Sequence, residues 1–188
     1  HVAALDQGLA LFGRSSTESA GRVDMARDKI ETLESLANDM LNTAAQSRLR
    51  TRNSHYIALA EDGAAEVAAL IEDALARGEL SQQALFDRSH RPIAGSEPTQ
   101  YQTGFTAYAD LRVRPLLDRH TAKDATIIGC CLIDMDGYLP THISARSQPQ
   151  RIGDPRWNME HARNRQIFMD AQTRRALDGD DDFYLFTY

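Results

Sequence analysis

The sequence predicts an α+β protein, in which long N-terminal helices are followed by a small antiparallel sheet with a covering helix. Three observations predict this fold class. Apolar residues recur with helical spacing through most of residues 17–77. The period changes near residue 126, where a short run rich in β-branched residues begins. The last six residues, "FYLFTY", have strong β propensity.

The composition is that of a folded globular chain. Its 188 residues are 42% hydrophobic and 26% charged, which is enough to bury a sizeable core. The net charge of -6 argues against nucleic acid as a partner, because a phosphate backbone attracts clustered positive charge. No stretch approaches the roughly 20 consecutive apolar residues that cross a bilayer. The chain begins with His1, so we expect a fragment or processed form whose parent protein could still be attached to a membrane.

Cysteine usage indicates the compartment. The two cysteines, Cys130 and Cys131, are adjacent, and neighbouring side chains of an extended segment point in opposite directions. A disulfide between them would be strained. We therefore expect a reducing cytoplasm.

Residues 17–50 are predicted to form a long helix that begins after a cap at Ser16 or Thr17. Apolar and small residues repeat every seven positions along it, as the a and d positions of a coiled coil do. These residues are Val23, Ala26, Ile30, Leu33, Ala37, Met40, Ala44 and Ser47. We call them the seam. Either a second copy of the chain or the helix at 54–77 is expected to cover it.

Further helices are predicted before the sheet. The segment 54–77 has the same spacing and ends at Gly78, and Ser81 caps a short helix that runs through Phe86. The Pro, Gly and Ser content of 88–100 predicts a loop. Residues 101–119 are predicted to be helical, with a kink or break at Pro115.

The sheet is predicted from two segments. Residues 126–143 form a β-hairpin with "DMDG" at its turn, and 183–188 form a final strand. A helix over 156–177 is expected to cover the sheet. Its inward residues should be Met159, Ala162, Ile167 and Ala171. The aromatic edge strand would need further strands or a second chain to protect it.

Metal binding and catalysis are both weakly supported by the hairpin residues. "DMDG" resembles the start of a calcium loop, but Ala145 stands where the twelfth-position glutamate belongs. The cysteine pair lacks the partners of a zinc site, so we expect no metal. Cys131 and His142 could meet across the hairpin as a nucleophile and its base, although no other catalytic motif accompanies them. We expect no enzymatic activity.

A ligand-binding wall is the preferred interpretation of this region. Donors, aromatic faces and positive charge on the second arm of the hairpin and on the helix behind it could orient a small polar or anionic molecule. The candidate ligand-binding residues are Tyr138, His142, Arg146, Trp157, Asn164 and Arg165. His142 is central to this hypothesis, because an imidazole can donate, accept and change its charge between pH 5 and 8.

The stretch "DMDGYLPTHISARSQPQRIGDPRWNMEHARNRQIFMD" resembles the sensory module of a group of bacterial methyl-accepting chemotaxis proteins. In that family a D-x-x-G-Y turn leads into L-P-T-H-N, F-S-Q-P and G-D-P, then a helix with N-R and R-I-F-D-D, and a strand close to L-L-Q-T-Y. The matching residues are Asp134, Gly137, Tyr138, Leu139, Pro140, Thr141, His142, Ser147, Gln148, Pro149, Gly153, Asp154, Pro155, Asn164, Arg165, Ile167, Phe168, Asp170, Thr187 and Tyr188. The family's Asn is replaced by Ile143, and its final strands are absent.

The resemblance implies a PAS-like or Cache-like sensor domain over residues 54–188, with residues 1–53 as a helical signalling and dimerisation segment. It implies a chemotaxis function: binding of a small molecule, relay through a dimeric helical rod, and action on a signalling domain and the chemotaxis kinase machinery. Some PAS-like sensors hold haem, which His120, His142 or His161 could ligate. A haem-dependent or redox-dependent sensor, and an enzyme using Cys131, remain the alternatives.

Overall fold

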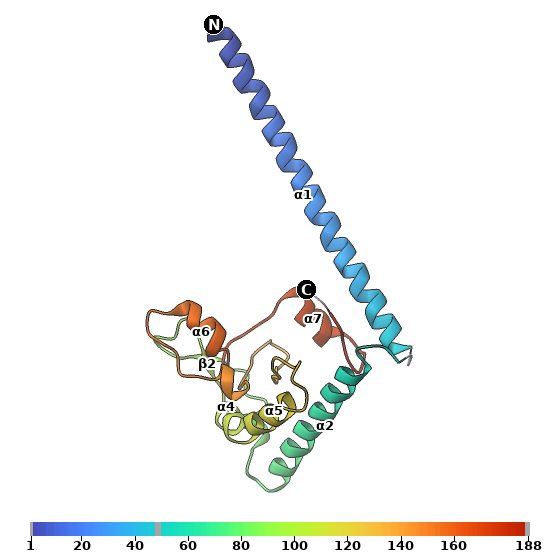
Figure 1. Ribbon diagram of the computed structural model, residues 1–188. Coiled ribbons are helices and arrows are strands. Elements are labelled where there is room, and N and C mark those ends of the chain that lie inside the picture. Colours follow the sequence, from blue (N-terminus) through green and yellow to red (C-terminus); the bar gives the residue numbers. More distant parts are fainter. Residues whose placement is uncertain (1, 48–49, 187–188) are drawn as a thin grey trace. The chain divides into compact units, whose positions relative to one another are not determined.

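The computed structural model describes residues 2–47 and 50–186, with side chains described from residue 12 onward. It is helix-rich, with a small two-stranded antiparallel sheet (Figure 1). The chain divides into two compact units. The first comprises residues 1–51 and 184–188, and the second comprises residues 52–183, which we call the body.

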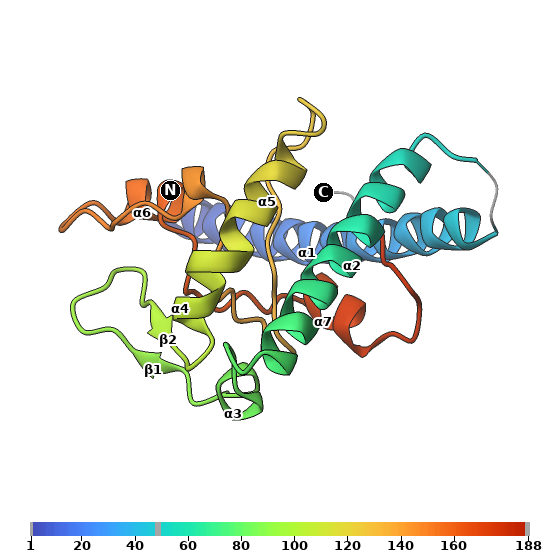
Figure 2. The same cartoon turned by 90° about the horizontal axis from the view of Figure 1, so that it is seen from below.

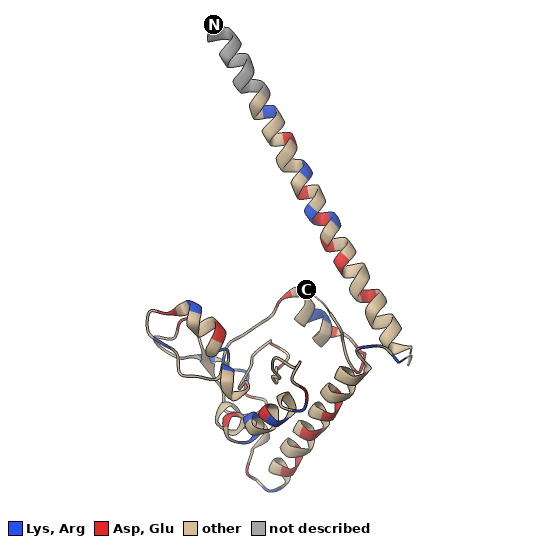
Figure 3. Ribbon diagram, in the orientation of Figure 1, with Lys and Arg blue, Asp and Glu red and all other residues tan. Residues whose placement is uncertain are grey.

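The first unit is built on α1 (Val2–Gln46), which begins well before the predicted start. The cap predicted at Ser16 or Thr17 is wrong, because the Thr17 hydroxyl donates to the Gly13 carbonyl of the preceding helical turn, 2.9 Å away. Such a bond lets threonine continue a helix. Basic and acidic residues are interspersed along α1 up to Lys29, and only acidic ones follow (Figure 3). Its large seam side chains are 56–67% exposed: Val23, Ile30, Leu33 and Met40.

The end of the chain lies against α1 instead of forming a strand. In residues 183–186 the backbone is irregular, so the predicted strand is wrong for these residues, and 187–188 lie outside the described part. The Asn42 side chain accepts a hydrogen bond from the Leu185 N–H (2.6 Å) and donates one to the Leu185 carbonyl (2.5 Å). A side-chain amide thus takes the place of a neighbouring strand.

The body begins with α2 (Ser54–Ala76) and α3 (Gln82–Leu85), as predicted. Gly78 has a φ of 71°, a left-handed conformation that suits glycine where a helix ends. The Ser81 hydroxyl caps α3 by accepting from the Ala84 N–H at 3.1 Å. α2 packs against α5 (Arg114–Thr121). The shared core contains Val67, Ala74, Leu80, Phe105, Ala109, Val113, Leu116, Leu117 and Ile143.

The helix predicted over 101–119 is divided. It consists of α4 (Thr106–Tyr108), the π-helix η1 (Ala109–Val113) and α5. Pro115 stands in the first turn of α5, where its missing N–H is tolerated. The change from π-helical to α-helical geometry directly before Pro115 is the predicted break.

The two-stranded sheet forms in a region predicted as a loop and a helix start. β1 (Arg91–Pro92) pairs with β2 (Tyr101–Gln102), and the antiparallel register sets Arg91 opposite Gln102. Figure 2 shows the two strands side by side. Because β1 includes a proline, it offers one N–H fewer than a regular strand and stays short.

The hairpin predicted over 126–143 is reduced to its turn. The Asp134 N–H donates to the Tyr138 carbonyl (3.0 Å), and all of these residues are described, but beyond the turn the two arms share only one isolated bridge, between Cys131 and His142. The second arm pairs elsewhere: the Leu139 N–H donates to the Gln166 carbonyl at 2.9 Å. The hairpin ladder is absent because residues distant in sequence take its hydrogen bonds.

The same pairing interrupts the helix predicted over 156–177. The structure has α6 (Pro155–His161) and α7 (Ala171–Asp178), capped by Asp154 and Asp170. Between them lies an extended segment at 162–170 that is interrupted by a turn at 164–165. Of the residues predicted to face inward, Ala162 is buried, whereas Met159, Ile167 and Ala171 are exposed. The 3₁₀ turn η2 (Ser144–Arg146) precedes this region.

The described residues include no helix with both the length and the apolar character required to cross a membrane.

Candidate functional site

The six residues predicted as a binding wall lie within the body but serve different local structures. Tyr138 is 2% exposed, and its phenol oxygen lies 2.8 Å from the Thr106 hydroxyl and 3.0 Å from the Tyr101 carbonyl. Burial raises the pKa of this phenol. Tyr138 therefore fastens the turn to the β2–α4 connection.

His142 is a core residue. It is 7% exposed, and its Nδ1 accepts a hydrogen bond from the Ile143 N–H at 2.8 Å. Burial, followed by the charges of Arg163 and Arg146, lowers the pKa of His142 to about 4. The imidazole is thus neutral across pH 5 to 8, so the predicted change of charge in that range is wrong.

The other four predicted residues stabilise separate loops. Arg146 donates to the Glu160 carbonyl at 3.1 Å, and the Trp157 ring lies 3.7 Å from the Arg151 guanidinium. The Asn164 side chain accepts from Gln100 at 3.2 Å.

Arg165 donates to Asp110 at 2.6 Å, and its φ is 62°. Asp110 lies on the π-helix and also accepts from Thr141 at 2.8 Å and from Arg114. These contacts join η1 and α5 to the second arm and to the extended segment. Within the described chain, the predicted wall is thus a set of structural contacts around several loops.

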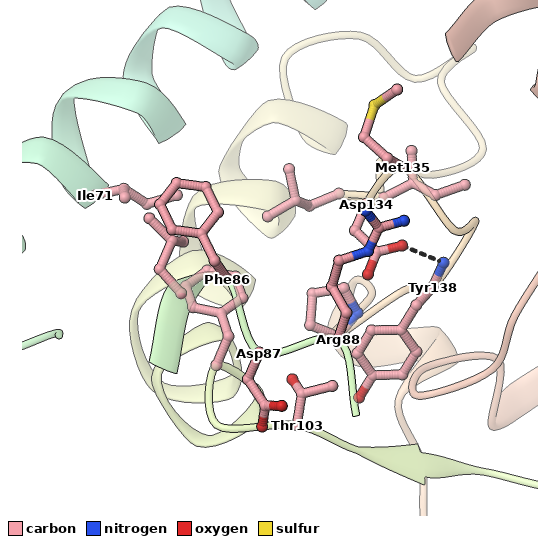
Figure 4. Close-up of a pocket in the computed structure, with 13 residues that line it drawn as sticks. Ile71, Phe86, Asp87, Arg88, Thr103, Asp134, Met135 and Tyr138 are labelled. Carbon is pink, nitrogen blue, oxygen red and sulfur yellow. Dashed lines mark hydrogen bonds between the residues drawn. The ribbon is translucent and has the colours of Figure 1, made fainter. Parts of the chain in front are cut away.

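A cavity of about 340 Å³ is lined in part by the turn that contains Asp134 and Tyr138 (Figure 4). We call it the turn pocket. Residues from α2, from the α3–β1 connection, from the segment before α4 and from the turn line it. They are Ile71, Leu85, Phe86, Asp87, Arg88, Thr103, Phe105, Leu132, Ile133, Asp134, Met135, Tyr138 and Pro140. Four separate segments thus meet around one mainly apolar space.

The turn that lines the pocket is stabilised by hydrogen bonds from its own backbone N–H groups to the Asp134 side chain. Its Oδ1 accepts from the N–H groups of Asp136 (2.8 Å) and Tyr138 (2.9 Å; Figure 4). Gly137 has a φ of 80°, and a Cβ there would lie 2.4 Å from the Phe168 carbonyl oxygen. "DMDG" is therefore a structural turn: its geometry explains why aspartate stands at position 134 and glycine at position 137.

Two charged contacts tie the turn to the α3–β1 connection. Arg88 donates from two nitrogens to the Asp136 carboxylate, which lowers the pKa of Asp136 and raises that of Arg88. His90 Nε2 lies 3.1 Å from Asp134 Oδ2. We call these two contacts the rim ties.

The rim ties also contain the best metal-ligand geometry among the described residues. His90, Asp134 and Asp136 can each offer an atom such that all three lie within 4.8 Å of one another. Arg88 already neutralises Asp136, so a cation bound by all three residues would have to displace the guanidinium. The arrangement is explained by these contacts alone.

A second cavity, of about 450 Å³, lies beside α2 and α5. It is lined by Tyr56, Leu59, Ala60, His120, Thr126, Ile127, Ile128, Gly129 and Cys130. His120 is 4% exposed, with Nε2 3.2 Å from Glu66. Its Nδ1 is buried over Gly63, where an added Cβ would lie 3.4 Å away. Nε2 of His120 thus faces Glu66, while its buried Nδ1 has no hydrogen-bond partner.

The environments of His161 and Cys131 complete the set of residues considered for haem binding and catalysis. The His161 ring packs at 4.5 Å from that of Trp157. Cys131 is exposed as a residue, yet desolvation of its thiol, followed by the influence of Cys130, raises its pKa. Cys131 and His142 form an isolated antiparallel backbone bridge, and His142 Nδ1 is already occupied by the Ile143 N–H.

Of the residues that line the turn pocket, sequence reasoning singled out only Tyr138; it missed Phe86, Arg88 and Met135 among others, and also His90, which contacts Asp134. The charges in "DRSH" and "DMD" are complementary, but 44 and 48 positions separate the paired residues. No local signal links them.

No family model, curated protein or solved structure matches this chain.

Proposed function

We propose that the body is a sensor module that binds a small molecule in the turn pocket, and that α1 passes the bound state to a second copy of the chain. The pocket is the observation that carries this proposal. Its walls come from four segments, and the rim ties hold two of them together. A bound molecule would therefore couple the turn to α2 and its core.

The wider role rests on the sequence resemblance. We propose that the chain is the PAS-like or Cache-like sensory part of a chemotaxis receptor that acts through a signalling domain on the chemotaxis kinase machinery. The "DMDGYLP" motif supports this proposal, because its residues form the pocket turn. Free, adjacent cysteines agree with a cytoplasmic setting.

The relay is proposed to use the seam of α1. A helix that presents apolar residues every seven positions on one side suits a supercoiled partner, and a rotation or shift of that pair can carry a signal. The large seam side chains are exposed within the first unit, which leaves them available to a second copy.

Binding is favoured over catalysis by the state of the candidate groups. The raised pKa of Cys131 keeps it as the weakly nucleophilic thiol, and the lowered pKa of His142 makes the imidazole a poor base. The turn pocket itself is lined chiefly by apolar side chains.

The proposal is tested by thermal unfolding of the full chain in the presence of a metabolite library. A ligand at about 100 times its Kd stabilises the folded state by about 2.7 kcal/mol, which corresponds to several degrees in Tm for a chain of this size. We expect hits whose stabilisation is lost in Ile133→Trp, which fills the pocket.

Ile152→Trp is the matched control, because Ile152 is fully exposed at 103% and lies outside the pocket lining. Hits that stabilise both variants equally would place binding elsewhere and contradict the proposal. A library without hits would also count against it.

A further inference from the structure

The charged side chains that line the turn pocket are each engaged by other groups of the protein, and this restricts what the pocket can bind. Asp134 accepts two backbone N–H groups on Oδ1 and faces His90 with Oδ2. Arg88 lines the pocket (Figure 4), and its guanidinium donates to Asp136. Both side chains therefore already have hydrogen-bond partners within the protein.

Asp87 is the third charged residue of the lining, and it is engaged as well. Its carboxylate accepts from the N–H groups of Ser89 (3.0 Å) and Gly104 (2.7 Å) and pairs with Arg91 at 3.2 Å. Hydrogen bonds from Ser89 and Gly104 lower the pKa of Asp87 well below its usual range. The carboxylate is thus committed to holding the loop before β1.

The remaining lining is apolar. Ile71, Leu85 and Phe105 form the side towards the core, and Leu132, Ile133 and Pro140 form the side of the turn. A charged molecule in this space would lose its hydration, and Asp87, Arg88 and Asp134 of the lining could contact it only by giving up partners within the protein, which is unfavourable. An uncharged apolar molecule would lose nothing comparable and would gain contact with these walls.

Two of the apolar residues that line the pocket are also exposed to solvent. Phe86 is 70% exposed and Met135 is 57% exposed, and they come from opposite walls (Figure 4). A molecule between them would remove apolar surface of both side chains from water. Methionine adapts its shape easily, so Met135 can close over ligands that differ in outline.

We propose that the turn pocket selects a compact, uncharged and largely apolar molecule, of the size of one substituted aromatic ring, and rejects anions and cations of the same shape. This inference deepens the proposed sensor function and rests on it. It reverses the polar or anionic ligand expected from the sequence, because the arginines of that prediction hold other loops.

A charge series of one shape tests the selectivity. Benzyl alcohol, benzoate and benzylammonium are titrated at pH 7 into the full chain, with binding followed by methyl NMR of Met135 and the isoleucines. We expect the Kd of benzyl alcohol to be at least about ten-fold lower than the Kd of either ion. Equal or tighter binding of an ion at these methyl groups would overturn the selectivity.

Variants locate the binding and separate the two proposals. Ile133→Trp should weaken benzyl alcohol binding at least about ten-fold, and Ile152→Trp should leave it unchanged. If Ile133→Trp fails to fold by circular dichroism, Ile71→Phe narrows the pocket from α2 instead. Binding of an ion that is lost in the pocket variant would overturn the ligand class and leave the sensor site in place.

The remaining outcomes overturn more. Benzyl alcohol binding that persists in the folded pocket variant would place the ligand outside the turn pocket and reject both proposals. If none of the three probes binds and Ile133→Trp weakens self-association in light scattering, an apolar side chain of a second copy is the occupant, and the small-molecule class is wrong.

Discussion

Helices α1 and α2 share the same apolar spacing but differ in what covers it. In α2, Val67 and Ala74 are 7% and 0% exposed and pack into the core with α5. In α1, Ile30 and Leu33 are 56% and 63% exposed. The comparison teaches that a seven-residue repeat predicts a helix with a partner, while the identity of the partner depends on the rest of the fold.

The strongest way to break this comparison is to remove one leucine from each environment. Leu117→Ala on α5, beside α2, should lower the free energy of unfolding by about 2 to 5 kcal/mol, because Leu117 is 5% exposed and its loss leaves a cavity. Leu33→Ala should change it by less than about 0.5 kcal/mol. Urea unfolding followed by far-ultraviolet circular dichroism reports the helices of both units; equal losses in the two variants would contradict the difference in burial.

A low pH should destabilise the buried core of the body in particular, because a buried histidine stabilises the body only while it is neutral. The unfolded chain binds a proton at His142 near pH 6.5, while the folded body does so only at about pH 4. The contribution of neutral His142 to the free energy of unfolding should therefore be fully present above about pH 6.5. The free energy of unfolding should fall by roughly 3 kcal/mol as the pH drops to about 4.

The measurement is urea unfolding at several pH values, with variant and wild type compared. His142→Gln should lose this part of the pH dependence, whereas His161→Gln, at a histidine with a 41% exposed side chain, should keep it. The same slope in His142→Gln and wild type would show that His142 is not responsible.

Self-association tests whether the α1 seam has a partner of its own kind. Ile30→Asp puts a charge into the seam and should weaken dimerisation by about a hundred-fold in Kd. Met25→Asp is the matched control, because Met25 is 58% exposed but lies off the seam. Light scattering above micromolar concentration measures both; a wild-type chain that stays monomeric would reject the seam as a dimer interface.

The smallest expected effect lies on the other side of α1, where Asn42 holds the end of the chain. Asn42→Ala removes both hydrogen bonds to Leu185 and should cost about 1 to 2 kcal/mol locally. Hydrogen exchange of the Leu185 amide should speed up about ten-fold or more. Thr43→Ala, which removes an exposed hydroxyl bond within α1, should leave that amide unchanged.

The candidate site was predicted in part. Tyr138 belongs to the turn pocket, and the sequence pointed to its turn as the most distinctive segment of the chain. Arg146 and Trp157 hold other loops, and Arg88 and His90 were treated as loop residues. Side chains that meet across more than forty positions leave no trace in local spacing, so only their observed contacts identify them.

The sequence alone determined the local backbone structure wherever a few neighbouring residues decide it. Gly78 ends α2, Ser81 caps α3, and the "DMDG" residues close a turn, because each effect acts over one to four positions. The tertiary structure decided where extended segments pair. Residues 162–170 leave the helix that their sequence predicts because Leu139 and Gln166 hydrogen-bond to each other, a long-range contact that outweighs local propensity.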